Sequence, residues 1–296
     1  MTMRETFVSA MDDALEVDPR LVVVLAEISA AQIATARTRH PNRVINVGIR
    51  EQLLVSVAGG LALTGLRPVV HTFASFLVER PFEQVKLDLG HQGVGAVLVS
   101  SGASYDMAYA GRTHQSPADV ALIDNLPGWT VHVPGHPDEA RRLILESLPG
   151  DGKVYVRLSE QSNAEPHLGV GFQVQRLGRR GVVLAVGPTL DGVLNATEGA
   201  DVTVLYASTI RPFDGAGLRA AIHATGVADV VLVEPYNRGT SAHAVAEALA
   251  ETPHRLLSLG VRRDVEVRTY GDMADHDLAH GLDETSLAAS INAFLP

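Results

Sequence analysis

The sequence contains no cysteine, which excludes a disulfide scaffold, a thiolate zinc site and a cysteine nucleophile. It is also short of basic residues, because 24 lysines and arginines stand against 34 aspartates and glutamates, for a net charge of −10. This balance disfavours partners that recognise a basic surface. We therefore expect no nucleic-acid partner and no anionic membrane partner.

Long hydrophobic runs are missing as well. The longest stretches without an acidic or basic residue are 52–66 and 89–105. Both fall short of the roughly 20 apolar residues that a membrane span needs. The N-terminus carries an acid early, at Glu5, and has no apolar core segment, so we expect no secretory signal. The expected location is the cytoplasm.

Short aliphatic runs alternate with helical patterns along the chain, which is typical of a mostly parallel α/β architecture. The 296 residues fit two domains, and a polar, glycine-rich stretch at 166–180 predicts the linker between domains at 1–165 and 181–296. The predicted strands lie at 21–25, 44–47, 69–70, 96–99, 130–133 and 154–158, and then at 182–186, 202–206, 230–233 and 256–259. Helices are predicted near 215–224, 242–251 and 284–294 in the second domain.

Two glycine-containing segments imitate phosphate-binding motifs. In 93–98, Leu98 stands where the third glycine of a dinucleotide fingerprint should be, and the glycines precede a strand instead of following one. The Gly-Asp-Gly of 150–152 imitates the start of a diphosphate–magnesium motif, but the next asparagine, Asn163, lies near the linker instead of on a downstream βαβ unit. We expect a plain turn at 150–152 and no metal ligands in this chain.

The most informative carboxylate is Glu51, in the first turn of a helix that directly follows a predicted strand. One interpretation is a charge that complements the helix dipole, worth about 0.3–1 kcal/mol. The other is a functional carboxylate at the carboxyl end of a strand, where open α/β sheets bind ligands. Spacing alone leaves both interpretations open.

The helix that Glu51 begins carries two further predictions. Adjacent glycines at Gly59 and Gly60 each cost about 1 kcal/mol in a helix relative to alanine, which indicates close approach of another backbone, as at a subunit interface. The apolar spacing predicts one buried face, made by Leu53, Leu54, Val57, Ala58 and Leu61.

Four segments in register resemble the C-terminal half of a transketolase. They are Gly-Ile-Arg-Glu-Gln at 48–52, Thr-Phe-Ala-Ser-Phe at 72–76, Gly-Arg-Thr-His-Gln at 111–115 and Thr-Ile-Arg-Pro-Phe-Asp at 209–214. The resemblance covers nearly the whole chain from Arg4 onward. It implies a pyrimidine-binding domain of a thiamine-diphosphate enzyme followed by the transketolase C-terminal domain, with the diphosphate-binding domain missing.

The resemblance assigns cofactor-binding roles to five residues. Glu51 would be the catalytic carboxylate that hydrogen-bonds N1′ of the aminopyrimidine, so that the cofactor's own 4′-imino nitrogen can take the proton from C2. Phe73 and Phe76 would contact the pyrimidine ring. Ile28 matches the bulky residue that holds the cofactor bent, and Glu27 stands where transketolases usually have aspartate.

The resemblance also implies substrate-binding residues. His114 matches a histidine that reaches the substrate or its intermediate, so it is expected to be both catalytic and substrate-binding. His71, beside Phe73 at a strand end, is expected to point into the same pocket. Arg4 matches the first of the two arginines with which the family binds the sugar phosphate.

The other residues with which the family binds the sugar phosphate are replaced in this chain. The family's serine, histidine and second arginine correspond here to Ala31, Gly102 and Glu160, and Ala110 replaces an aspartate that would meet a sugar hydroxyl. Replacing arginine by glutamate removes a charge-assisted pair and adds repulsion toward a dianion. We therefore expect a substrate without a terminal phosphate, or a phosphate grip in the partner subunit.

The resemblance implies the β-type subunit of a split transketolase-like transferase that moves a two-carbon ketol unit with thiamine diphosphate. The expected partner is an N-terminal subunit that carries the diphosphate-binding domain and the Mg²⁺ ligands, in an α2β2 heterotetramer with a β–β contact, acting on a small-molecule substrate. The alternatives are a β subunit of a 2-oxoacid dehydrogenase, a deoxyxylulose-phosphate-synthase-like carboligase, or a non-catalytic regulatory subunit. The presence of Glu51 disfavours the last of these.

Overall fold

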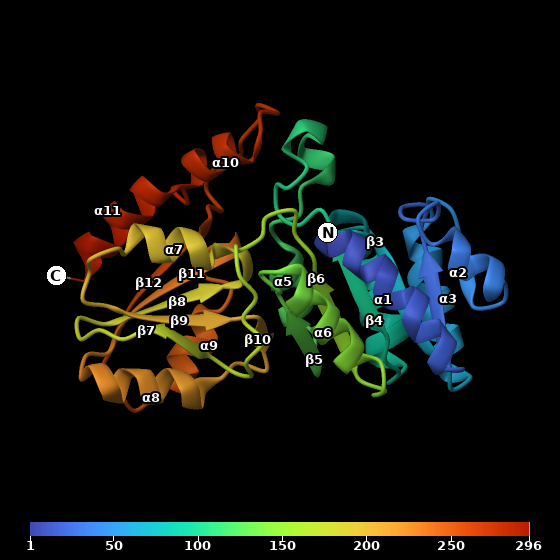
Figure 1. Ribbon diagram of the computed structural model, residues 1–296, viewed down its shortest axis with the longest axis horizontal. Coiled ribbons are helices and arrows are strands. Elements are labelled where there is room, and N and C mark those ends of the chain that lie inside the picture. The colour runs from blue at the N-terminus through green and yellow to red at the C-terminus, as the bar shows by residue number, and fades with distance from the viewer. Residues whose placement is uncertain (296) are drawn as a thin grey trace.

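The computed structural model describes residues 1–295 and contains two α/β domains, each built on its own sheet. Figure 1 shows the two sheets side by side, with helices on both faces of each. The predicted two-domain α/β fold is confirmed. Each predicted aliphatic run lies within an observed strand or overlaps one.

The first sheet has seven strands in the order β10-β5-β6-β4-β3-β1-β2. All neighbours are parallel except β10, which pairs antiparallel with β5. The strands are β1 (Leu21–Leu25), β2 (Val44–Asn46), β3 (Arg67–Phe73), β4 (Val97–Ser101), β5 (Trp129–His132), β6 (Lys153–Arg157) and β10 (Thr209–Arg211).

The helices of the first domain cover both faces of this sheet, because alternate strand residues point to opposite sides. On β1, Leu21 and Val23 pack in the core under α1 (Met3–Val17) and α6 (Pro137–Ser147), whereas Val22 and Val24 pack in the core under α3 (Glu51–Leu63). The helices are α1 (Met3–Val17), α2 (Ala34–Arg39), α3 (Glu51–Leu63), α4 (Phe82–Gln84), α5 (Asp119–Asp124) and α6 (Pro137–Ser147), with π-helical turns η1 (Ser75–Glu79) and η2 (Val85–His91) and 3₁₀ turns η3 (Ala108–Ala110) and η4 (Arg112–His114).

The second sheet has the order β12-β11-β8-β9-β7, and only β7 runs antiparallel to its neighbour. Its strands are β7 (Gln173–Arg176), β8 (Val182–Val186), β9 (Thr203–Ala207), β11 (Asp229–Asn237) and β12 (Arg255–Val261). The surrounding helices are η5 (Gly187–Thr189), α7 (Leu190–Ala196), α8 (Gly215–Thr225), α9 (Ala242–Ala248), α10 (Met273–His280) and α11 (Glu284–Phe294).

Two strands depart from the predicted domain organisation. β7 lies inside the expected linker 166–180, where no strand is predicted from the sequence. β10 belongs to the second half of the chain but adds to the edge of the first sheet. Both segments are polar and short, so their strand character comes from pairing with a neighbour and not from an aliphatic run.

The buried face of α3 also differs from the prediction. Leu54, Val55 and Ala58 are buried, whereas Leu53 is 43% exposed. A Cβ on Gly59 would lie 2.6 Å from the carbonyl oxygen of Asp88, so the close backbone approach occurs within this chain. Nothing lies within 4 Å of the corresponding position on Gly60. Gly59 therefore lets η2 pack against α3, while a subunit contact at the open position of Gly60 stays a prediction.

Candidate functional site

Strained backbone marks the carboxyl edge of the first sheet. Glu27 and Ser29, directly after β1, have φ values of 68° and 62°, and Ser104, after β4, has 48°. Non-glycine residues rarely adopt such angles, and they cluster where function requires an unusual geometry. The same edge is where open α/β sheets bind their ligands.

Glu51 begins α3 at this edge and is only 2% exposed. Its Oε2 accepts a hydrogen bond from Arg80 Nη1 at 2.7 Å. A carboxylate that serves only the helix dipole can stay in water, whereas a buried one needs a partner to offset its desolvation. Glu51 is therefore held in place by a specific ion pair at the ligand-binding edge.

Arg80 is a site residue that sequence reasoning missed. Its guanidinium lies 3.9 Å from the ring centroid of Phe76, in a cation–π contact, while it donates to Glu51. Phe76 lies within η1, and Arg80, four residues later, directly follows the last residue of that turn. The four-residue spacing on a helical segment was the available signal.

Phe73, Phe76 and His114 form one aromatic cluster, although His114 is distant in sequence. The ring centroids of Phe73 and Phe76 are 6.0 Å apart, and that of His114 lies 5.9 Å from Phe73 and 5.1 Å from Phe76. All three pairs are edge-to-face, and all three side chains are partly exposed. The cluster offers an open aromatic surface next to the buried carboxylate of Glu51.

His71 lies behind this surface and not on it. The side chain is fully buried, and burial lowers its pKa to about 3, so the ring is neutral. Nδ1 lies 2.8 Å from the carbonyl oxygen of Val99, which only accepts, so Nδ1 carries the hydrogen. Nε2 therefore accepts from Ser29 Oγ at 2.9 Å, and Ser29 Oγ accepts from Arg4 Nε at 3.0 Å.

Arg4 and His71, two residues that are expected to bind substrate, lie at opposite ends of this chain of hydrogen bonds. Arg4 is partly exposed and lies 6.0 Å from the ring of Phe73, beside the aromatic cluster. His71 is connected to Arg4 and the aromatic cluster only through its hydrogen bond with Ser29. Sequence reasoning missed Ser29, because no neighbouring residue indicates its positive φ.

Glu27 and Ile28 lie on the turn after β1. The exposed Glu27 accepts from Asn46 Nδ2 through Oε2 at 3.1 Å, and its own N–H donates to Asn46 Oδ1 at 3.1 Å. Ile28 is partly buried. The carboxylate of Glu27 is thus hydrogen-bonded to Asn46, the last residue of β2.

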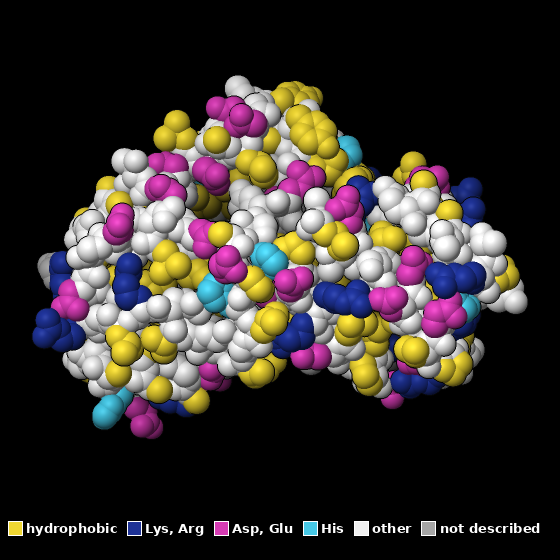
Figure 2. Space-filling model, in the orientation of Figure 1, with side chains coloured by type: hydrophobic (Ala, Val, Ile, Leu, Met, Phe, Trp, Pro, Cys, Tyr) yellow, Lys and Arg dark blue, Asp and Glu magenta, His cyan; other side chains and the backbone are white. Residues whose placement is uncertain are grey.

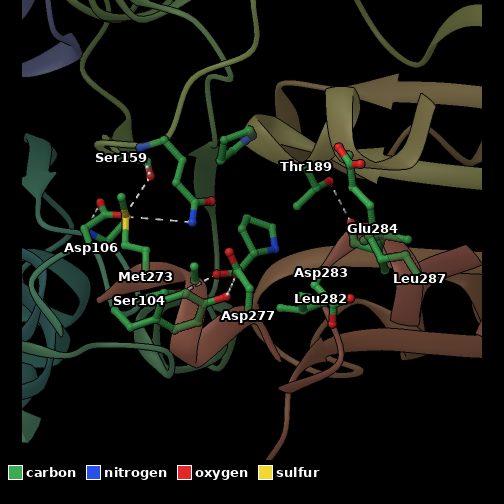
Figure 3. A pocket seen from close by; sticks show the side chains of 18 of the residues that line it. Ser104, Asp106, Ser159, Thr189, Met273, Asp277, Leu282, Asp283, Glu284 and Leu287 are labelled. Atoms are coloured by element: carbon green, nitrogen blue, oxygen red, sulfur yellow. Dashed lines mark hydrogen bonds between the residues drawn. The ribbon is translucent and has the colours of Figure 1, made fainter. Parts of the chain in front are cut away.

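A separate cavity of about 450 Å³ lies between the two domains. In Figure 3, Met273 and Asp277 of α10 face Ser104, Asp106 and Ser159 of the first domain. Burial raises the pKa of Asp106 to about 7, although Ser159 Oγ and the N–H of Glu160 donate to its carboxylate. None of the sequence-predicted site residues lines this cavity.

Charges of both signs are mixed on the face of the molecule that Figure 2 shows. Figure 2 shows acidic and basic side chains interspersed over both domains, with a hollow between them. Within residues 1–295, no group of three or more histidine, aspartate or glutamate side chains is arranged to hold a metal ion. No helix in the described part of the chain has the length and apolar character needed to cross a membrane.

Comparison with known proteins identifies the family. Residues 1–165 match the family "Transketolase, pyrimidine binding domain". The chain is 61% identical over 295 residues to an uncharacterized 33.6 kDa protein in the fasciation locus of Rhodococcoides fascians, and the match covers 99% of this chain and 95% of that protein. It is 33% identical over 309 residues to a subunit of the apulose-4-phosphate transketolase of Actinobacillus succinogenes, with 98% of this chain and 97% of that one covered.

Longer enzymes and a solved structure match as well. A 1-deoxy-D-xylulose-5-phosphate synthase of Thioalkalivibrio sulfidiphilus is 30% identical over 96% of this chain, which spans only 45% of that enzyme. The solved structure of a split gene transketolase, described as an inactive β4 tetramer, aligns with a TM-score of 0.86 at 26% identity, covering 100% of this chain and 98% of that one. The chain therefore belongs to the transketolase family and corresponds to the C-terminal, β-type subunit of its split members.

Proposed function

We propose that this chain supplies the pyrimidine-binding half of a thiamine-diphosphate site in a split transketolase-like enzyme that transfers a two-carbon ketol unit. The observation that carries the proposal is the buried, ion-paired Glu51 beside an open aromatic surface. Thiamine diphosphate, when bound, supplies carbanion chemistry that side chains cannot provide.

The residues at the sheet edge fit an aminopyrimidine. Phe73 and Phe76 offer partly exposed ring surface for a flat heterocycle, and Glu51 offers a carboxylate for a ring nitrogen. Glu51 would hold and return a proton at N1′, which is general acid–base catalysis worth about 10²–10⁴-fold in rate. Arg80 orients the carboxylate and offsets the cost of burying its charge.

The site needs a second wall, because the aromatic surface is partly exposed in this chain. We assign that wall, the diphosphate contacts and the Mg²⁺ ligands to a partner subunit that carries the diphosphate-binding domain. Mg²⁺ requires oxygen ligands in a near-octahedral array. The likeness to a split transketolase whose β4 tetramer is described as inactive supports this assignment. We expect an α2β2 assembly with a β–β contact, and no turnover by this chain alone.

We further propose that the substrate lacks a terminal phosphate, or that the partner subunit supplies the residues that bind this phosphate. Gly102 has a φ of 69°, and a Cβ there would lie 3.2 Å from Phe73, so this position favours glycine over a side chain that binds phosphate. Glu160 is exposed and negative where the family has arginine. Arg4 is the residue of the family's phosphate-binding set that this chain keeps, and its Nε already donates to Ser29 Oγ.

The proposal is tested by Glu51→Gln in the complex reconstituted with the partner subunit. We expect kcat to fall by about 10²–10⁴-fold because the carboxylate that shares a proton is lost. Glu83→Gln is the matched control, since Glu83 is an exposed glutamate on the nearby α4. Unchanged complex mass in both variants establishes that assembly survives.

A near-normal rate for Glu51→Gln would reject the thiamine mechanism and favour a non-catalytic subunit. The same complex is offered xylulose 5-phosphate, an unphosphorylated ketose and a 2-oxo acid. A preference for the phosphorylated ketose that Arg4→Ala abolishes would contradict the substrate proposal. Release of CO₂ from the 2-oxo acid would favour the second candidate, a carboligase of the deoxyxylulose-phosphate synthase type or a 2-oxoacid dehydrogenase.

A further inference from the structure

A second cavity, of about 410 Å³, lies between the loop that follows β4 and the chain that follows β12. In Figure 1 the short turns η3 and η4 stand beside the α10 end of the second domain. Five of the lining side chains are arginine or histidine and only one is acidic; they are Arg112, Arg262, Arg263, His276, His280 and Glu266. The cavity is therefore locally basic on a chain whose net charge is −10.

Two of the arginines, Arg112 and Arg263, form no direct ion pair with a carboxylate of the described chain, although Arg112 lies close enough to Glu79 to offset part of the rise that burial causes in the pKa of that carboxyl. Arg263 donates from Nε to the carbonyl oxygen of Arg238 at 3.1 Å and from Nη2 to Thr240 Oγ1 at 3.4 Å. Arg112 donates from Nη1 to the carbonyl oxygen of Gln115 at 3.0 Å. Among residues 1–295, neither guanidinium forms a salt bridge. Both have further N–H groups that suit an oxyanion, which guanidinium binds through paired hydrogen bonds.

Arg262 differs, because Asp264 already pairs with it at 2.9 Å. The carboxylate of Glu266 also lines the cavity and opposes an anion. With Arg112 and Arg263 unpaired, the arginines still exceed the acids that face the cavity. A cleft lined by one sign of charge concentrates ligands of the opposite sign.

The wall of the cavity is preorganised by stacked rings. The ring centroid of Tyr105 lies 5.1 Å from that of His276 and 5.7 Å from that of His280. His276 is 1% exposed, and its Nε2 lies 3.2 Å from the carbonyl oxygen of Tyr270. The backbone N–H of Arg262 donates to Nδ1 of His280 at 3.4 Å. These contacts fix the shape of the cavity before a ligand enters, which lowers the entropic cost of binding.

We propose that this cavity binds a small molecule bearing a phosphate or carboxylate group, held by Arg112 and Arg263. Its volume lies within the roughly 300–1,000 Å³ of ligand pockets. The cavity is distinct from the candidate active site, since neither Glu51 nor the Phe73–Phe76 pair lines it. A bound oxyanion would also fix η4, because Arg112 and His114 are the first and last residues of that turn.

The test is isothermal titration of the whole chain, without partner or cofactor, with inorganic pyrophosphate and separately with citrate. We expect one ligand per chain, and a loss of about tenfold to a hundredfold in affinity for Arg263→Gln, as expected for one charge-assisted hydrogen bond. Arg263 is exposed, so the variant should fold. Arg219→Gln is the matched control, because Arg219 is also exposed and donates to a backbone carbonyl, that of Ala248.

A second pair of variants separates this cavity from the candidate active site. Arg112→Gln should weaken binding as Arg263→Gln does, whereas Arg4→Gln should leave it within about twofold. Tighter binding of pyrophosphate than citrate would assign the ligand to the phosphates, and the reverse would assign it to the carboxylates. The proposal is overturned if neither anion binds, if Arg263→Gln binds like the wild type, or if Arg4→Gln alone abolishes binding. None of these results depends on the thiamine mechanism.

Discussion

A buried ion pair joins the loop that carries His114 to both domains, and its removal gives the sharpest stability prediction. Arg157 Nε donates to Asp119 Oδ2 at 2.8 Å, and the two side chains are 1% and 0% exposed. Arg157 Nη2 donates to Ser104 Oγ at 2.6 Å, and Ser104 in turn donates to the carbonyl oxygen of Pro235 in the second domain. The pair thus fixes the start and end of the loop between β4 and α5.

Asp119→Ala leaves the guanidinium of Arg157 buried without its counter-charge. Its remaining acceptors, Ser104 Oγ at 2.6 Å and the carbonyl oxygen of Pro235 at 3.5 Å, are both neutral. Tyr155 OH also loses Asp119 as an acceptor but keeps its hydrogen bond with Ser100 at 2.8 Å, so the tyrosine adds little. Breaking a buried pair by removing one partner costs about 3–5 kcal/mol. This is a large part of the roughly 5–15 kcal/mol that holds a typical domain folded.

The measurement is the free energy of unfolding of the purified chain in urea at pH 7. Asp119→Asn keeps the shape and removes only the charge, so it should cost less than Asp119→Ala and remain measurable if the alanine variant fails to fold. The matched control is Glu146→Ala, which removes an exposed i,i+4 pair with Arg142 and should cost about 0.3–0.5 kcal/mol.

A double variant completes the test. Arg157→Met with Asp119→Ala removes both charges, so it should be more stable than Asp119→Ala alone, because no uncompensated charge stays buried. A cost below about 1 kcal/mol for Asp119→Ala would refute the reasoning, since it would mean that water or another group compensates Arg157. A double variant no more stable than the single one would have the same consequence.

Two further outcomes are expected of the isolated chain. Gly59→Ala should destabilise it by about 1–3 kcal/mol, because the added Cβ would lie 2.6 Å from the carbonyl oxygen of Asp88. Gly60→Ala should stabilise it by about 0.5–1 kcal/mol, because nothing lies within 4 Å of the added Cβ and alanine favours the helix. Equal changes in the free energy of unfolding in urea for the two variants would contradict this packing. His71, whose pKa is lowered from 6.5 to about 3, stabilises the fold fully above pH 6.5 and loses this contribution as the pH falls toward 3, with a slope of up to about 1.4 kcal/mol per pH unit. His71→Gln should flatten that slope between pH 6 and 4, and an unchanged slope would show that the buried ring does not control it.

The sequence by itself determined the fold class and most strand positions. Aliphatic runs such as 21–25 and 182–186 are buried on both faces of a parallel sheet, so composition alone marks them. The segments that resemble transketolase likewise marked Glu51, Phe73, Phe76 and His114 as candidates, because each of these residues stands in one of them.

Tertiary structure alone decided what those residues contact. The ion pair from Arg80 to Glu51 joins two helical segments, and the burial of His71 behind Ser29 depends on strain after β1. β10 adopts its place because β5 offers a free sheet edge. Such contacts join residues far apart in the chain, and a sequence pattern records only the spacing of neighbours. The arginine-lined cavity follows the same rule, since Arg112 and Arg263 line one cavity only when the two domains pack together.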